Sequence, residues 1–231
     1  MRPSLPLALA LLGPLLHADG LADLKAALKA LPAPAKVHVR IEEDGRELEE
    51  GKEQVEHRTA LVEDGPGGTR VLEDSRPAER RKGSGDKGAD RKDSGDFREA
   101  LRPGEELLEQ LGKAKLLEEK AETREGRPVR RLRLALDLNL DAEARSHLKQ
   151  AEHEATVWIG PDNLPLAMDQ RIEVRARVLL FASVWTKIEI HRRFQQAQGR
   201  LLLLDETAEV QGSALGKTFS SRDTTRCSLV P

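Results

Sequence analysis

The sequence predicts an α+β fold: a long, curved antiparallel sheet, open like half of a barrel, with a few helices covering its apolar face. From Leu166 to Val178 apolar residues recur at nearly every second position, with mostly charged residues between them, and the pattern returns from Val184 to Ile190. Such strands have one apolar and one polar face. At about 3.3 Å per residue the first is about 40 Å long, which is too long for a typical immunoglobulin-like sandwich. Helical segments are too few for alternating βαβ units.

The chain begins like an exported protein. A short positive start precedes a mainly apolar stretch from Leu5 to Leu16, and the small residue Ala18 follows. This arrangement is typical of a secretory signal peptide and is shorter than the roughly 20 apolar residues of a transmembrane helix. We therefore expect a signal peptide at 1–18, in preference to a buried N-terminal helix. A single domain, 19–231, should then lie in the periplasm or outside the cell, without an integral membrane segment and without a Cys for a lipid anchor.

A helix and a meander are expected next. Apolar residues at spacings of three and four from Leu21 to Leu31 indicate an amphipathic helix, which Asp19 caps and Pro32 ends. Alternation from Val37 to Ile41 predicts a strand, and Asp44-Gly45 predicts a hairpin turn because both residues tolerate positive φ. Further strands are expected at 47–63 and 70–73, with a turn at 64–68 between them.

The composition changes abruptly from Asp74 to Asp96. This segment consists mainly of Arg, Lys, Asp, Gly and Ser and contains hardly any apolar residue. It can bury too little apolar surface to offset the entropy cost of ordering. We expect 74–96 to be a disordered insertion between two strands, and a solvated linker rather than a binding loop.

The second half should be mostly strands. A short helix is expected at Phe97, opened by a capping box of Asp96 and Glu99, followed by a helix at 105–111. Residues 113–124 fit a helix or a strand, and we predict a strand because the turn at Glu125-Gly126 precedes another. The remaining expected elements are a strand at 132–138, a polar helix at 140–153, a strand at 156–159, a turn at 160–163 and hairpin turns at Gln198-Gly199 and Gln211-Gly212.

Composition limits the partners. Charged residues make up 34% of the chain but balance to a net charge of −2, and aromatic residues make up 3%. Nucleic-acid binders show a basic excess, and stacking surfaces need aromatic rings, so we expect no nucleic-acid partner. Cys227 is the only cysteine, which rules out a disulfide within the chain. We expect it to be a partly buried strand residue rather than a nucleophile.

Catalytic motifs are missing from the sequence. It contains no G-x-S-x-G, no H-E-x-x-H and no Gly-rich phosphate loop. His147 and His153 stand six apart, which is not the three- or four-residue spacing of a helical metal pair. Surface positions for His38 and His57 are favoured over a metal pair on neighbouring strands. Trp158 and Trp185 are expected in the core or in a cavity wall. We therefore expect no enzyme, no metal site and no cofactor.

Three stretches of the chain resemble the periplasmic lipoprotein-carrier superfamily, the LolA/LolB-like fold. They are the helix at 21–31 that leads into the strand at 37–41, the Glu125-Gly126-Arg127 hairpin before the strand at 132–138, and the strand, turn and Pro-Leu segment at 157–166. The resemblance covers most of 19–231 and rests on the order of elements. It implies an unclosed barrel with helices as a lid and an apolar cavity that receives acyl chains. The insertion at 74–96 and the scarcity of aromatic residues depart from the family.

Two functions remain after these exclusions. The first is a periplasmic or cell-envelope protein that binds or carries a lipid, an acyl chain or a lipoprotein between sheet and helices. The expected cavity residues are Val174, Val184, Ile188 and Leu202. The second is a non-catalytic envelope scaffold or interaction module on the same fold, without a ligand cavity. A packed core and a cavity have the same apolar alternation, so the sequence leaves both open.

Overall fold

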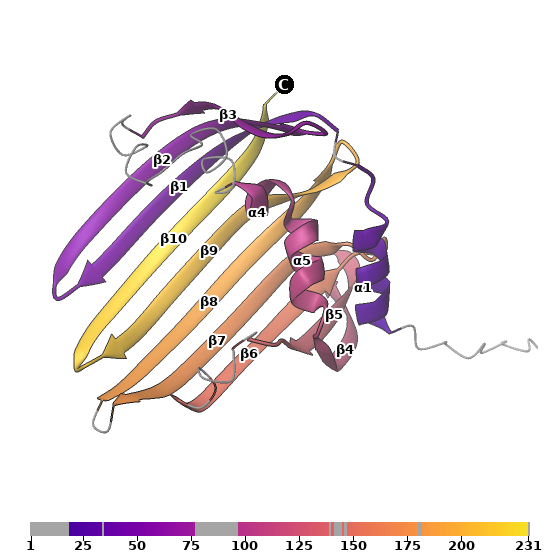
Figure 1. Cartoon of the computed structure of the whole chain (residues 1–231). Coiled ribbons are helices and arrows are strands. Elements are labelled where there is room, and N and C mark those ends of the chain that lie inside the picture. Colours follow the sequence, from indigo (N-terminus) through magenta and orange to yellow (C-terminus); the bar gives the residue numbers. More distant parts are fainter. Residues whose placement is uncertain are drawn as a thin grey trace, which may run out of the picture.

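The expected fold class is confirmed: the structure is a long, curved antiparallel sheet with a few short helices on one face (Figure 1). This computed structural model describes residues 19–33, 35–76, 97–138, 140, 145, 147–179 and 182–230. The expected signal peptide, 1–18, lies outside these residues. None of the helices in the described part has the length and apolar character that a bilayer crossing requires.

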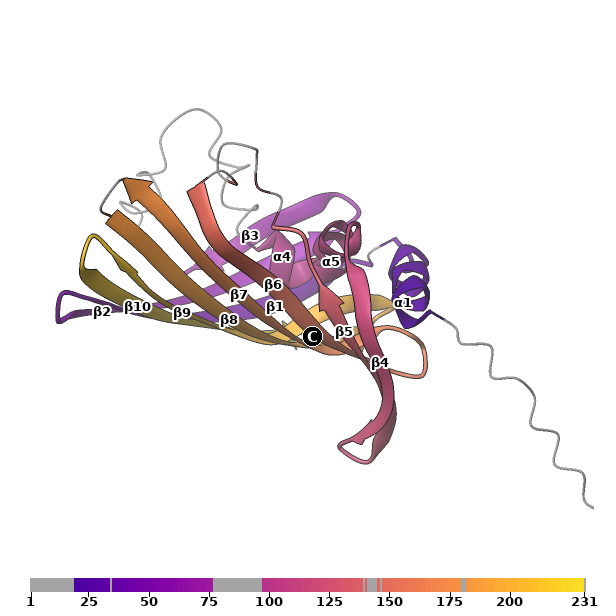
Figure 2. The ribbon, with the colours of Figure 1, turned by 90° about the horizontal axis from the view of Figure 1, so that it is seen from below.

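The described elements form one sheet and three helices. The helices are α1 (Gly20–Lys29), α4 (Arg98–Leu101) and α5 (Pro103–Leu111). The strands are β1 (Val37–Glu49), β2 (Lys52–Gly65), β3 (Gly68–Asp74), β4 (Lys115–Arg124), β5 (Arg127–Ala135), β6 (Leu148–Ile159), β7 (Pro165–Leu179), β8 (Ala182–Ala197), β9 (Arg200–Ala214) and β10 (Lys217–Val230). Their order in the sheet is β3-β2-β1-β10-β9-β8-β7-β6-β5-β4. The edge strands β3 and β4 do not pair with each other, so the curved sheet stays open (Figure 2).

Tight turns connect most neighbouring strands. Within the described residues, four two-residue turns have positive φ at both positions: Glu50-Gly51, Glu125-Gly126, Gln198-Gly199 and Leu215-Gly216. This is the backbone of a type I′ turn, which matches the twist of the strands it joins. The expected turns at Asp44-Gly45 and Gln211-Gly212 are wrong, because β1 and β9 run straight through them. Gly212 instead lies against the Phe219 ring, where a Cβ atom would not fit.

The first helix forms as expected. The Asp19 side chain caps it, accepting hydrogen bonds from the backbone N–H groups of Leu21 at 3.0 Å and Ala22 at 3.4 Å. These bonds satisfy donors that have no partner within the helix. Leu24 and Leu28 lie on the buried side of α1, in the core shared with the sheet.

The expected polar helix at 140–153 is wrong over its second half. β6 begins at Leu148 and pairs with β7 along its whole length. Ala, Glu, Gln and Lys favour a helix in isolation, but pairing with a long neighbouring strand outweighs that preference. His153 is therefore a strand residue opposite Ile172. Residues 141–144 and 146 of the expected helix lie outside the described part of the chain.

The helices cover one end of one sheet face, here called the inner face (Figures 1 and 2). The core lies between the helices and the inner face of the sheet. It contains Leu24, Leu28, Phe97, Leu101, Leu107 and Leu111 from the helices and their approaches, and Val39, Ile41, Val62, Leu132, Leu134, Val157, Met168 and Leu203 from the sheet. A polar contact continues this layer, since the amide of Gln170 on β7 donates to Gln110 on α5 at 2.8 Å.

The opposite, outer face is polar. The Glu173 carboxylate lies between Arg171 and Arg175, which donate to it at 3.1 and 3.0 Å. The Trp185 indole N–H donates to the same carboxylate, and that of Trp158 donates to Glu122. The expectation that both tryptophans belong to the core or a cavity wall is wrong, because alternation along β6 and β8 places them on the outer face.

Strand β3 includes Asp74, the first residue of the expected insertion. Asp74 ends β3, and its carboxylate accepts hydrogen bonds from Arg58 and Arg76. The Ser75 backbone N–H donates to the Thr59 carbonyl at 2.9 Å. The sheet thus extends to Asp74. Residues 77–96 of the expected insertion lie outside the described part of the chain.

Candidate functional site

A pocket of about 250 Å³ lies where α1, the α4–α5 pair and the beginning of β9 meet. Its walls are mainly apolar. The residues that form them are Leu28, Leu31, Pro32, Ala33, Leu101, Gly104, Leu108 and Leu201, and Arg102, Glu105 and Arg200 complete the lining. The pocket thus lies between the sheet and the helices that cover it.

Gly104 lets α5 lie close to α1 at this pocket. A Cβ atom at this position would lie 3.1 Å from the Leu31 Cδ1 atom and 3.7 Å from the Leu28 Cδ2 atom. Pro103 occupies the first turn of α5, where its missing N–H removes no helical hydrogen bond. The Pro-Gly pair that interrupts the helical segment in the sequence therefore begins α5 and shapes one wall of the pocket.

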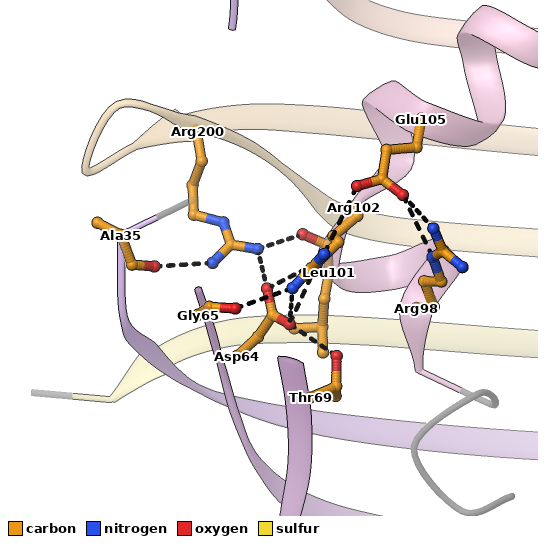
Figure 3. Close-up of polar contacts among 9 residues, drawn as sticks. All are labelled: Ala35, Asp64, Gly65, Thr69, Arg98, Leu101, Arg102, Glu105 and Arg200. Carbon is orange, nitrogen blue, oxygen red and sulfur yellow. Dashed lines mark hydrogen bonds and ion pairs between the residues drawn. The ribbon is translucent and has the colours of Figure 1, made fainter. Parts of the chain in front are cut away.

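A buried ion cluster fixes the helices to the sheet beside the pocket (Figure 3). Asp64, at the end of β2, is completely buried. Arg102, between α4 and α5, donates to its carboxylate at 3.0 and 3.2 Å, and Thr69 donates at 2.6 Å. Arg200, at the beginning of β9, forms a further ion pair with Asp64. One carboxylate thus joins the helical layer to two strands.

Both arginines also hold backbone carbonyl groups. Arg200 donates to the carbonyl oxygens of Leu101 at 2.7 Å and Ala35 at 3.0 Å, and Arg102 donates to that of Gly65 at 3.0 Å. The C-terminal end of α4 and the segment before β1 are therefore tied to the same cluster. Charge-assisted hydrogen bonds of this kind are roughly twice as strong as neutral ones.

Every arginine of the cluster has an acidic partner. Burial alone would raise the pKa of Asp64, but hydrogen bonds from Arg102, Thr69 and Arg200 lower it below its ordinary value. The carboxylate therefore stays ionised. Glu105, at the exposed side of the pocket, lies 3.6 Å from Arg102. Glu105 also accepts hydrogen bonds from Arg98, so each of the three arginines has an acidic partner and the pocket offers a ligand mainly apolar contact.

The structure brings together three of the four expected cavity residues. Strand pairing places Ile188 opposite Ile172, Val184 opposite Ala176 and Val174 opposite Thr186, which puts the three on the inner face. All three are half-buried. Leu202 is buried but points to the opposite side of β9 from Leu201 and Leu203, which belong to the core. None of the four lines the pocket beside the cluster, and their contact with a ligand stays a prediction.

The histidines do not form a common site. His38 contacts Glu63 at 3.1 Å, and His57 contacts Asp44 at 2.8 Å, so the two rings have separate acidic partners on β1 and β2. No group of three or more His, Cys, Asp or Glu side chains with metal-binding geometry occurs among the described residues. Burial raises the pKa of Cys227 to about 12, which keeps its thiol protonated. The expectation that this protein is not an enzyme stays a prediction.

Sequence reasoning missed Asp64, Arg102 and Arg200. Asp64 was expected in a turn, and neither arginine stands in a recognisable motif. The ion pairs join residues 38 and 136 positions apart in the chain, so no local pattern indicates them. The one available signal was the Pro103-Gly104 pair, which marks the close approach of α5 but not its partners.

No protein-family model matches this chain, and no curated protein matches its sequence. Two solved structures align with most of it. One is a DUF1329 family protein from Desulfovibrio piger, with 13% sequence identity, 90% of each chain covered and a TM-score of 0.40. The other is MucB, solved in complex with MucA(peri), with 9% identity, 91% of this chain and 93% of that chain covered and a TM-score of 0.26. Similarity at this level does not assign the chain to either family.

Proposed function

We propose that this protein is exported to the cell envelope and binds the apolar chain of a lipid, fatty acid or lipoprotein in the pocket between α1, the α4–α5 pair and β9. The observation that carries the proposal is the apolar lining of that pocket, which lies between a sheet and helices joined by one buried ion cluster. The resemblance of the sequence to the lipoprotein-carrier superfamily supports the same function.

The size of the pocket limits what it admits. A volume of about 250 Å³ lies just below the roughly 300–1,000 Å³ of typical small-molecule pockets. The pocket therefore suits part of an acyl chain rather than a whole lipid. Each buried methylene contributes about 0.8 kcal/mol, so a segment of roughly six methylenes gains about 5 kcal/mol before the cost of association. We expect moderate affinity and ready release, as transport requires.

Calorimetric titration with lauric acid tests the proposal. Leu108 is half-buried and lines the pocket, whereas Glu109, the next residue of α5, is exposed. Leu108→Trp fills the pocket and should abolish binding, while Glu109→Trp adds the same ring outside it and should bind like the wild type. Circular dichroism checks that both variants are folded. A wild type that gives no binding heat would favour the interaction module without a ligand cavity.

Export has its own test. Residues 1–18 have the composition of a signal peptide, and cleavage after Ala18 would leave Asp19, the cap of α1, at the new N-terminus. Mass spectrometry of the protein from the envelope fraction should find a chain that begins at Asp19. An intact Met1 in that fraction would contradict the export proposal.

A further inference from the structure

The helices leave much of the inner face uncovered. They pack over the end that contains the core, and the long strands β7 to β10 extend well beyond them (Figure 1). In this part, called here the open inner face, Ile172, Ile188, Ile190 and Val210 project between β7 and β9. All four are half-buried rather than enclosed. Apolar side chains that stay partly accessible side by side on neighbouring strands could pack against a partner.

The open inner face becomes acidic across the sheet. Strand pairing forms a row that runs from Ile172 through Ile188 and Val210 to Ser221 and Glu47. The neighbouring rows follow the same order: one runs from Ile190 through Ala208 to Asp223, and another from Val174 through Gly212 and Phe219 to Glu49. On β7 to β9 each row is uncharged and mainly apolar, with Gln170 and Thr186 as the polar members, and each row ends in a carboxylate on β10 or β1. The surface is thus divided lengthwise into an apolar half and an acidic half.

The acidic half has an excess of negative charge. Arg58 is held by Glu43 and Asp74, and Arg192 by Glu106 and Glu206. Neither arginine is paired with Glu47 or Asp223, which have no ion-pair partner among the described residues. Burial and the nearby Glu206 charge raise the pKa of Asp223, as expected where carboxylates lack positive neighbours. A hollow of about 700 Å³ lies over this half and is lined by Glu43 and Asp223 together with Arg58 and Arg76, which pair with Glu43 and Asp74.

Helix α5 shows how a helix binds to this sheet face. Leu107 and Leu111 are buried in the core beneath it, while Glu106 and Gln110 contact Arg192 and Gln170 of the sheet. Gln170 and Ile190 face each other across β7 and β8, so the open inner face begins next to the last contact of α5. A second helix beside α5 would continue the same layer.

We propose that the open inner face binds a basic amphipathic helix of a partner protein. Its apolar side would pack on Ile172, Ile188 and Val210, and its Lys or Arg side chains would face Glu47 and Asp223. The division of charge favours this partner over an anionic lipid surface, a fatty acid or a nucleic acid, because the acidic half repels each of these. The open inner face is separate from the pocket, so binding of the helix does not depend on lipid binding.

A designed peptide tests the surface. The probe is a fluorescently labelled Leu/Lys amphipathic peptide of roughly 18 residues, long enough to form a helix. Its counterpart has every Lys replaced by Glu. Fluorescence anisotropy should show binding of the Leu/Lys peptide that weakens as salt rises, and no binding of the Leu/Glu peptide. Equal binding of both peptides, or no binding of either, would overturn the proposal. The proposal would also be wrong if the protein binds anionic vesicles and the Leu/Lys peptide does not reduce that binding.

Matched variants locate the binding site. The double variant Glu47→Lys/Asp223→Lys reverses two exposed charges on the open inner face and should weaken peptide binding more than about tenfold. Glu42→Lys/Glu53→Lys makes the same net change on the outer side of β1 and β2 and should leave affinity within about twofold. Ile188→Ser should weaken binding and Lys187→Ser should not. Equal effects within either matched pair would refute the assignment.

A last variant separates this surface from the pocket. Leu108→Trp, which fills the pocket, should leave peptide affinity unchanged even where it abolishes lauric acid binding. Loss of peptide binding in Leu108→Trp would show that the peptide occupies the pocket, and the docking surface would be wrong. If the wild type binds the peptide but not lauric acid, only the proposed lipid function is wrong, and the docking surface stands.

Discussion

Replacing Asp64 with Asn should destabilise the protein severely. Asp64 is completely buried and is the shared acidic partner of Arg102 and Arg200. The amide removes the negative charge, which leaves the buried Arg200 without an ion-pair partner among the described residues and leaves Arg102 only its longer contact with Glu105. Breaking a buried ion pair by removing one partner costs about 3–5 kcal/mol. For a domain of this size, that loss lowers the melting temperature by roughly 6–20 °C, since each kcal/mol corresponds to about 2–4 °C.

The control for Asp64→Asn is Glu105→Gln. Glu105 also faces Arg102, at 3.6 Å, but it is half exposed, and exposed ion pairs contribute about 1 kcal/mol or less. Thermal melts followed by circular dichroism should separate the two variants clearly. If Asp64→Asn melts within about 1 °C of the wild type, or no lower than Glu105→Gln, the ion cluster does not hold the helices to the sheet.

The pH dependence of unfolding gives a second readout for the same residue. The pKa of Asp64 is lower in the folded protein than in the unfolded chain, because the hydrogen bonds from the arginines and Thr69 outweigh the effect of burial. Its contribution to stability is therefore complete above the unfolded pKa and is lost as the pH falls through the folded one. The wild type should lose its stability advantage over Asp64→Asn in acid. An advantage that persists unchanged in strong acid would contradict this reasoning.

Further outcomes are expected elsewhere in the fold. Burial would raise the pKa of Asp74, but hydrogen bonds from two arginines lower it to about 2. Urea unfolding should therefore show the stabilising contribution of Asp74 disappearing as the pH falls from about 4 to about 2. The variant Asp74→Asn should lack this pH-dependent loss. Gly212→Ala places a Cβ atom against Phe219 and should cost about 1–3 kcal/mol in urea unfolding, whereas Gly67→Ala, with open space around it, should cost almost nothing. Cys227 should react with iodoacetamide at pH 8 only after denaturation, and rapid labelling of the native protein would contradict its burial.

The sheet was predictable from sequence because its strands alternate so regularly. Residues 166–178 and 184–190 fall within β7 and β8, and the apolar positions from Met168 to Ala176 and from Val184 to Ile190 lie on the inner face, as expected. The strand at 113–124 was chosen over a helix, and β4 confirms that choice. Each of these segments is itself amphipathic, and its position in the sheet follows from its own pattern.

The hairpin turns were only partly predictable, since a glycine next to a polar residue does not always make a turn. Asp44-Gly45 and Gln211-Gly212 have the composition of a turn but lie within strands. Both glycines make room for an inner-face neighbour instead: Gly45 for Asp223 and Gly212 for Phe219. A tight turn and a close approach of a neighbouring side chain both require glycine, so the sequence does not distinguish them. Only the pairing of the strands does.

The site was less predictable than the sheet. Apolar alternation indicated the inner face, and Val174, Val184 and Ile188 lie there, but the pocket formed around other residues. Its position depends on how α1 and α5 pack, and on ion pairs between residues far apart in the chain. A charged residue in a loop has the same local pattern whether it ends up in solvent or in a buried cluster. Tertiary contacts alone decide between these outcomes.

The pairing of β1 with β10 has a consequence for how the chain folds. Elsewhere in the sheet, each strand lies beside one that is consecutive in sequence, but β1 lies beside the last strand, from His38 opposite Val230 to Glu49 opposite Phe219. Read from β4 through β10 and then from β1 to β3, the sheet is an uninterrupted meander. The chain order is a circular permutation of that meander: the chain connects the two edge strands, β3 and β4, and its termini lie at the neighbouring strands β1 and β10. Until the ribosome has made Lys217 and the rest of β10, β1 can pair only with β2. The first three strands therefore join the others only when synthesis is almost complete.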